Sequence, residues 1–114
     1  MQNFRKLNVW DKSHKLTLKI YALSKNFPKE ELFGLTSQLR RAVSSIPTNI
    51  AEGTGRGSNP DFARFIQIAM GSACETEYLL LLCAELNFYP MDQYENLLKE
   101  IIEIKKMLTA RSKN

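Results

Sequence analysis

Three short clusters of helix-breaking residues divide this sequence into four longer segments. The clusters lie at residues 26–28, at 53–57, where three of five residues are glycine, and at 87–91. Between them, apolar residues recur every three or four positions, the period of an α-helix with one buried face, and no segment alternates as a β-strand does. Short connections make consecutive helices antiparallel neighbours. The sequence therefore predicts an all-α fold, an antiparallel up-down four-helix bundle formed by residues 1–114 as a single domain.

The expected helices have recognisable start and stop signals. The first covers residues 9–27 and stops before Pro28, and the third has Pro60 at its first helical position. In the fourth, Asp92 and Glu95 have the spacing of a capping box. The residues predicted to cap the four helix N-termini are, in chain order, Asn8, Thr36, Asn59 and Asp92.

The second expected helix contains a proline. Its apolar stripe consists of Leu39, Val43, Ile46 and Ile50, which share one face over four turns. Pro47 lies inside this stripe, where it removes a backbone donor and clashes with the preceding turn, at a cost of about 3 kcal/mol in an ordinary helix. We therefore expect this helix to be kinked at Pro47 and to be stabilised there by packing.

Composition and length are those of a small globular domain. Of the 114 residues, 44% are hydrophobic and 25% are charged, ordinary values for a folded domain and unlike those of disordered chains. The longest apolar run, residues 79–84, is far shorter than the roughly 20 residues that cross a bilayer, and the N-terminal residues lack the apolar stretch of a signal peptide. We expect a cytoplasmic protein without a membrane partner.

Cys74 and Cys83 lie nine residues apart on one expected helix. That spacing separates them by about 13 Å along the helix axis, which is too far for a disulfide. We expect both to be small, reduced residues of the core.

The residue types needed for a catalytic or metal site are largely missing. His14 is the single histidine, and no glutamate precedes it at the spacing that di-iron bundles use. A nucleophile–histidine arrangement would have to be built on His14, and nothing in the sequence provides an orienting partner for it. We therefore expect no catalytic residues, no metal, no cofactor and no enzymatic activity.

The glycine cluster at 53–57 has some features of a phosphate-binding loop. Such a loop follows a strand and ends in Lys-Ser or Lys-Thr, whereas here a helix precedes the glycines and no lysine follows them. A tight interhelical turn with glycines at positive φ fits the sequence better. Arg56, within the cluster, can still meet an anion near the start of the third helix.

Four consecutive leucines, residues 79–82, place apolar side chains all round one turn of the third helix. A chain of this length cannot easily bury two faces of one helix. The run is therefore either a wide core stripe or part of a subunit interface, and the sequence leaves both open.

Basic residues gather in the first half of the chain. Residues 1–58 hold ten basic and four acidic residues, a net charge of +6, whereas residues 59–114 have a net charge of −2. A continuous basic surface on the first two helices is suited to following a phosphate backbone. Few aromatic residues lie among these cations in the sequence, so base stacking is not indicated. The residues predicted to contact nucleic acid are Lys12, Lys15, Lys19, Arg40, Arg41 and Arg56.

Residues 38–53, Gln-Leu-Arg-Arg-Ala-Val-Ser-Ser-Ile-Pro-Thr-Asn-Ile-Ala-Glu-Gly, form the most distinctive motif of the sequence. Together with Gly55-Arg56, Phe27-Pro28 and Gly71-Ser72-Ala73, this motif resembles the signature of small bacterial four-helix-bundle proteins called 23S rRNA intervening-sequence proteins. The matches extend over nearly the whole chain. The residues to which the resemblance gives a structural or oligomer-forming role are Ser45, Ile46, Pro47, Asn49, Ile50, Glu52 and Gly53.

The resemblance implies a fold and an assembly more than a function. Members of that family are antiparallel four-helix bundles that associate into homopentamers. A related branch is the accessory protein of diversity-generating retroelements, which binds nucleic acid and a reverse transcriptase. For most members the biochemical role is undefined, and the ribosomal name describes where the genes lie.

Two hypotheses of function follow. The first is a non-enzymatic homo-oligomer, a pentamer as the resemblance implies, that binds RNA or DNA through phosphate contacts at its basic surface. The second is a protein–protein adaptor for a nucleic-acid enzyme such as a reverse transcriptase, without direct binding of nucleic acid.

Overall fold

The computed structural model describes residues 3–112 of the chain. Within that range it contains no strand and four α-helices: α1 (Asn8–Ser24), α2 (Leu35–Thr54), α3 (Asn59–Glu85) and α4 (Met91–Ser112). Two short 3-10 helices, η1 (Phe4–Lys6) and η2 (Lys29–Glu31), precede α1 and α2. The predicted all-α four-helix bundle is confirmed.

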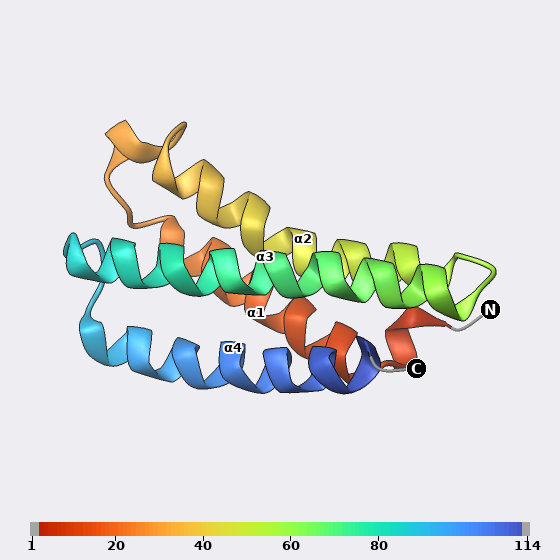
Figure 1. Cartoon of the computed structure of the whole chain (residues 1–114). Helices are drawn as coiled ribbons and strands as arrows, with labels where there is room; N and C mark the ends of the chain where they lie inside the picture. Colours follow the sequence, from red (N-terminus) through yellow and green to blue (C-terminus); the bar gives the residue numbers. More distant parts are fainter. Residues whose placement is uncertain (1–2, 113–114) are drawn as a thin grey trace.

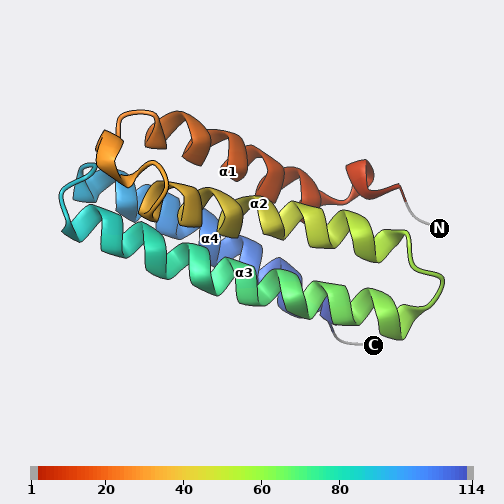
Figure 2. The same cartoon turned by 90° about the horizontal axis from the view of Figure 1, so that it is seen from above.

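The helices form an elongated bundle that measures 43 × 24 × 20 Å (Figures 1 and 2). Figure 1 shows the chain reversing its direction at each connection, which is consistent with the expected up-down arrangement. Among neighbouring helices, α2 and α3 pack together most extensively, whereas α1 and α4 share the smallest contact. The contact between α1 and α4 is therefore the least extensive side of the bundle.

The apolar stripes of the four helices meet in one core. The predicted stripe of α2 is fully buried, as are large side chains of the other three helices. Those large side chains are Val9, Leu16 and Ile20 of α1, Ile66 and Leu80 of α3, and Ile101, Ile104 and Leu108 of α4. Of the leucine run, Leu79 and Leu80 are buried in the core of the single chain, and the next two are half-buried.

Pro47 lies inside α2 without ending it. Because proline has no N–H, the carbonyl of Val43, four residues earlier, loses its helical partner. The Thr17 hydroxyl of α1 lies 3.3 Å from that carbonyl oxygen and 2.8 Å from the carbonyl oxygen of Ser13, and it donates its one proton to either. A side chain of α1 thus offers a donor where Pro47 removes one. In Figure 1, α2 changes direction near its middle, which is consistent with the predicted kink.

The helix ends differ from the predicted ones by a few residues. α1 ends at Ser24 rather than at Phe27, because Phe27 is buried with its ring against Phe88 and Tyr89, at centroid distances of 5.5 and 5.9 Å. Asp92 is the second residue of α4 rather than its cap, and its carboxylate accepts from the next backbone N–H. The N-caps of α1, α2 and α3 are Leu7, Gly34 and Ser58 in place of Asn8, Thr36 and Asn59.

The glycine cluster lies at the predicted turn between α2 and α3, but without the predicted positive φ. No glycine among residues 3–112 has a positive φ, and α2 continues through Gly53 as far as Thr54. Gly53 instead allows α3 to approach closely, since a Cβ placed there would lie 3.0 Å from the Cβ of Phe65 and 3.2 Å from the ring of Phe62. The absence of a side chain at Gly53 is thus a packing requirement between helices.

A positive φ, of 65°, occurs instead at Asn87, in the connection between α3 and α4. The N–H groups of Asn87 and Phe88 donate to the carbonyls of Ala84 and Cys83, which is the hydrogen-bond pattern of a Schellman cap at the end of α3. Asparagine tolerates this left-handed conformation better than most residues do. The chain therefore turns sharply from α3 into α4 at Asn87.

Only one of the two cysteines belongs to the core. Cys83 is fully buried, whereas Cys74 is exposed on α3, so the expected burial of Cys74 is wrong. Both thiols are free. Burial raises the pKa of the Cys83 thiol to about 11, with a smaller contribution from the charge of Glu31, and this group is protonated and unreactive at neutral pH.

Candidate nucleic-acid interface

The lysines predicted on α1 are paired with carboxylates. The Nζ atoms of Lys12 and Lys19 lie 3.1 and 3.0 Å from carboxylate oxygens of Glu103 and Glu100 on α4, and both pairs join residues far apart in the sequence. Lys15 pairs with Asp11, one turn earlier, at 2.9 Å. Exposed pairs of this kind contribute at most about 1 kcal/mol each to stability. They do, however, neutralise the stripe of lysines that the sequence predicts as a bare cationic face.

Arg56 lies just beyond α2, at the far end of the bundle from the start of that helix. Its guanidinium is 3.7 Å from the Glu52 carboxylate and 4.7 Å from the centre of the Phe65 ring. The guanidinium of Arg64 lies over the same ring, also at 4.7 Å, and pairs with Asp61. Phe65 is only 5% exposed, so these arginines cover the buried ring.

Arg40 is held in place by groups of α1 rather than by an acid. Its Nε donates to the Ser24 hydroxyl oxygen at 2.8 Å, and one terminal nitrogen donates to the Tyr21 carbonyl at 3.4 Å. Its guanidinium also lies 4.9 Å from the centre of the Tyr21 ring. The second of these hydrogen bonds helps to cap the Tyr21 carbonyl in the last turn of α1. The adjacent Arg41 donates to the Ser37 hydroxyl at 2.7 Å.

Neither Arg40 nor Arg41 forms an ion pair with any carboxylate among the described residues. The acids of α1 and α2 are Asp11 and Glu52, and both lie at the opposite end of the bundle. Lys25, which caps α1 directly after Ser24, likewise has no ion pair within residues 3–112. We call Lys25, Arg40 and Arg41 the α1–α2 basic face.

The structure therefore divides the six predicted residues into two groups. Arg40 and Arg41 belong to the α1–α2 basic face, whereas the others, Lys12, Lys15, Lys19 and Arg56, each have a carboxylate partner. Tyr21 is not among the residues predicted from the sequence, because its proximity to Arg40 arises from the packing of two helices. The one sequence feature that could have indicated Tyr21 is its place on a helix rich in lysines, three residues before Ser24.

The distinctive motif of α2 contributes mainly to packing. Ile46, Pro47, Ile50 and Gly53 are buried, and Gly53 contacts α3. The Ser45 and Ser72 hydroxyls lie 2.8 Å apart and join α2 to α3, and the Asn49 amide donates to the Ser45 carbonyl and hydroxyl at 2.8 and 2.9 Å. Glu52 is exposed and pairs with Arg56.

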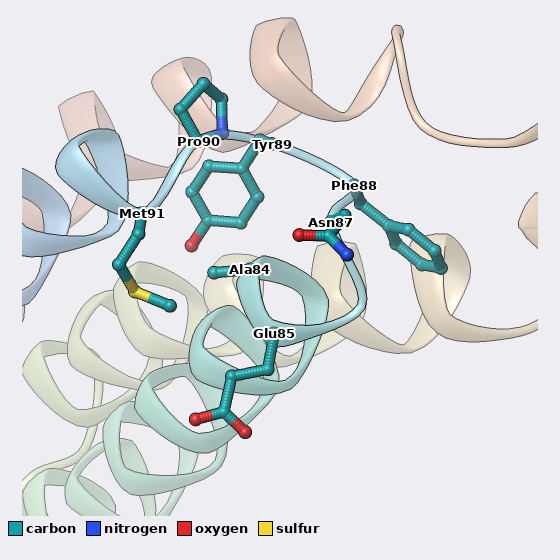
Figure 3. A pocket seen from close by; sticks show the side chains of 7 residues that line it. All are labelled: Ala84, Glu85, Asn87, Phe88, Tyr89, Pro90 and Met91. Atoms are coloured by element: carbon teal, nitrogen blue, oxygen red, sulfur yellow. The ribbon is translucent and has the colours of Figure 1, made fainter.

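A shallow hollow of about 600 Å³ lies at the turn from α3 to α4 (Figure 3). Its polar groups are the Glu85 carboxylate and the Asn87 amide, and most of its other lining side chains are apolar. The Tyr89 hydroxyl is occupied by the Leu80 carbonyl, at 2.8 Å. The lining residues are Ala84, Glu85, Asn87, Phe88, Tyr89, Pro90 and Met91. This set contains no nucleophile with an adjacent base.

The described part of the chain offers no metal site and no membrane-spanning helix. Residues 3–112 contain no cluster of three or more His, Cys, Asp or Glu side chains placed to hold a metal ion. Among the same residues, no helix combines the length and the apolar character that crossing a bilayer requires. His14 is half-buried and stacks on the Trp10 ring, with 4.8 Å between the ring centres.

Comparison with known proteins finds a solved structure and a family model that match this chain. A crystal structure at 1.70 Å of a protein of unknown function from the S23 ribosomal protein family, from Bacteroides thetaiotaomicron VPI-5482, has the same fold with a TM-score of 0.82. The two sequences are 32% identical, and the match covers 93% of this chain and 99% of the other. No curated protein matches the chain. The sequence model described as 23S rRNA-intervening sequence protein matches residues 5–110. This chain therefore belongs to the 23S rRNA-intervening sequence protein family.

Proposed function

We propose that this protein is a non-enzymatic homo-oligomer that binds RNA or DNA through phosphate contacts. The observation that carries the proposal is the α1–α2 basic face, whose arginines have no carboxylate partner among the described residues. Each cation that meets a phosphate releases condensed counterions, and that release drives binding. Arg40 and Arg41 are the first contacts because a phosphate meets them without displacing an acid.

The other predicted cations are secondary contacts. A phosphate that reaches Lys12 or Lys19 must first exchange with Glu103 or Glu100. Lys15 and Arg56 require the same exchange with acids on their own segments. The free energy gained at these positions is therefore smaller than at Arg40 and Arg41.

A homo-oligomer, with the pentamer as the state that the family resemblance implies, would repeat the basic face around an assembly. Exposed apolar side chains support self-association: Phe33 is 93% exposed, Tyr78 59% and Ile68 41%. Light scattering at micromolar concentration tests this part of the proposal. A monomer throughout that range would contradict it.

The decisive experiment measures binding of a fluorescent 20-nucleotide RNA at several salt concentrations. We expect affinity to fall steeply with salt. The double variant Arg40→Gln, Arg41→Gln should flatten the slope of log K against log salt by about 0.7–0.9 for each phosphate that it no longer neutralises. The matched control is Lys99→Gln, Lys106→Gln, which removes the same charge from exposed positions of α4. Absent binding at low salt would refute nucleic-acid binding, and binding insensitive to salt would refute phosphate contacts as its basis.

A second candidate function is that of an adaptor for a protein partner such as a reverse transcriptase. The exposed Phe33 side chain, in the connection before α2, favours it, because large apolar groups in contact with water mark protein contacts. A protein that is captured by the wild-type chain after nuclease treatment and in high salt, but not by Phe33→Asp, would support this function. Capture that disappears with nuclease would favour the first.

A further inference from the structure

We propose that Tyr21 and Arg40 form a stacking site for an unpaired base, so that the α1–α2 basic face selects single-stranded over double-stranded nucleic acid. This inference rests on the proposed function and names the partner of that same face. It depends on the side-chain geometry where α1 and α2 meet. The partner is identified by its chemistry: a flexible phosphate backbone with bases free to leave the stack.

Tyr21 places an aromatic ring at the surface beside a cation. Its side chain is 41% exposed, and the Arg40 guanidinium lies 4.9 Å from the ring centre. Leu18, one turn earlier on the same helix, is 57% exposed. An exposed aromatic ring next to unpaired cations is the combination on which bases of single strands stack, whatever their sequence.

Arg40 is already ordered before any ligand arrives. Its hydrogen bonds to Ser24 and to the Tyr21 carbonyl fix the guanidinium plane, so binding costs little further side-chain freedom. Guanidinium planes also serve as stacking surfaces for splayed-out bases. Two flat groups, one aromatic and one cationic, thus lie together in a fixed arrangement.

Cations flank this stacking site on both helices. Lys25 lies one helical turn after Tyr21, and Arg41 directly follows Arg40. We expect a strand with one base on the Tyr21–Arg40 pair to bring its adjacent phosphates to these residues. A duplex offers the same cations its phosphates only, since its bases are held inside the stack and their release costs a few kcal/mol.

The opposite end of α2 provides a contrast within the same molecule. There Arg56 and Arg64 also lie over an aromatic ring, but Phe65 is 5% exposed and both arginines pair with acids. A base has no access to that ring. Exposure and unpaired charge therefore distinguish the Tyr21–Arg40 site from a packing contact.

The test compares fluorescence anisotropy of a labelled 20-nucleotide oligo-dT strand with that of a duplex of equal length. We expect the wild type to bind the strand more tightly. Tyr21→Leu should weaken strand binding roughly tenfold, which is the effect of removing one base stack, and change duplex binding by no more than about twofold. Tyr21→Phe should retain strand binding. Ile102→Ala, which removes a side chain of α4 that is 41% exposed like that of Tyr21, is the matched control and should leave both affinities unchanged.

An abasic strand of the same length provides a readout that needs no variant. The wild type should bind this strand about as weakly as Tyr21→Leu binds oligo-dT, since neither complex has the stack. Equal affinity of the wild type for oligo-dT, the abasic strand and the duplex would overturn the inference while leaving salt-dependent phosphate binding in place. If none of the three binds at low salt, the proposed function fails and this inference fails with it.

Discussion

Two arginines lie over aromatic rings at opposite ends of α2, and their surroundings differ. Near the start of the helix, Arg40 lies over Tyr21, a ring 41% exposed, and has no acidic partner among the described residues. Beyond its end, Arg56 lies over Phe65, a ring 5% exposed, and pairs with Glu52. The two arginines lie at nearly equal distances from their rings, yet the exposed Arg56 lies over a buried ring and the half-buried Arg40 lies over an exposed one. The proposed stacking site therefore differs from the packing contact in the exposure of its ring and in having no ion pair among the described residues.

The largest expected difference between the two ends is in stability. Phe65→Ala should lower the free energy of unfolding by about 3–5 kcal/mol, because it removes a buried ring. Tyr21→Ala should lower it by about 1 kcal/mol or less, since the ring is partly in water and its contact with Arg40 is a surface one. Urea denaturation followed by circular dichroism measures both. If both substitutions lowered the free energy of unfolding equally, the Phe65 ring would not differ from the Tyr21 ring as a packing contact from a surface contact.

Gly53 tests how tightly the Phe65 end is packed. Gly53→Ala should destabilise the protein by about 1–3 kcal/mol despite the better helix propensity of alanine, because its Cβ would meet the Phe65 Cβ at 3.0 Å. Gly71→Ala is the control, since a Cβ there has nothing within 4 Å and should stabilise α3 by about 0.5–1 kcal/mol. Thermal and urea unfolding measure both changes. A stabilising Gly53→Ala would show that this end can relax.

Substitution of Thr17, on α1, tests how the Val43 carbonyl is satisfied in the middle of α2, between Arg40 and Arg56. Thr17→Val should cost about 1 kcal/mol, because it removes the hydroxyl that lies near the Val43 carbonyl left free by Pro47. In a Pro47→Ala background, where an N–H is restored to that carbonyl, the cost should fall. A double-mutant cycle measures this coupling. Equal costs in both backgrounds would show that Thr17 serves Ser13 alone.

The smallest expected stability effect concerns the lysines of α1. Glu100→Gln with Glu103→Gln should change stability by less than about 1 kcal/mol, because the ion pairs with Lys19 and Lys12 are exposed. It should tighten RNA binding and steepen the salt slope by about 0.7–0.9 for each lysine that reaches a phosphate.

Glu75→Gln with Glu95→Gln is the control for that change in net charge, since both glutamates are exposed and neither has an ion pair among the described residues. If the two double variants tighten binding equally, net charge alone is responsible. The α1 lysines would then have no separate role beside the α1–α2 basic face.

Much of the fold could be predicted because helices depend on local spacing. The stripe from Leu39 to Ile50 is buried as predicted, and the breaker clusters lie at the connections. Helix ends were less predictable. The last turn of α1 was misplaced because Phe27 is drawn into the core by rings at the α3–α4 turn, more than 60 positions away. Gly53 was misassigned because its closest neighbour, Phe65, is on another helix.

The candidate site was predictable only in part. Arg40 and Arg41 could be found as cations of a basic half of the chain. The pairing of Lys12 and Lys19 with acids of α4 could not, because it depends on which faces of two distant helices meet. For the same reason Tyr21 could not be predicted, since its ring contacts Arg40, 19 positions later.

The sequence by itself determined the four helices, their apolar faces and the excess of basic residues in the first half, since these follow from local periodicity and composition. Tertiary structure decided which of those charges remain available. An ion pair or a ring contact forms only when two side chains come within a few ångströms, and the register between packed helices sets that distance. The net charge of +4 was present in the sequence, but packing decided which cations of α1 and α2 have no ion pair among the described residues.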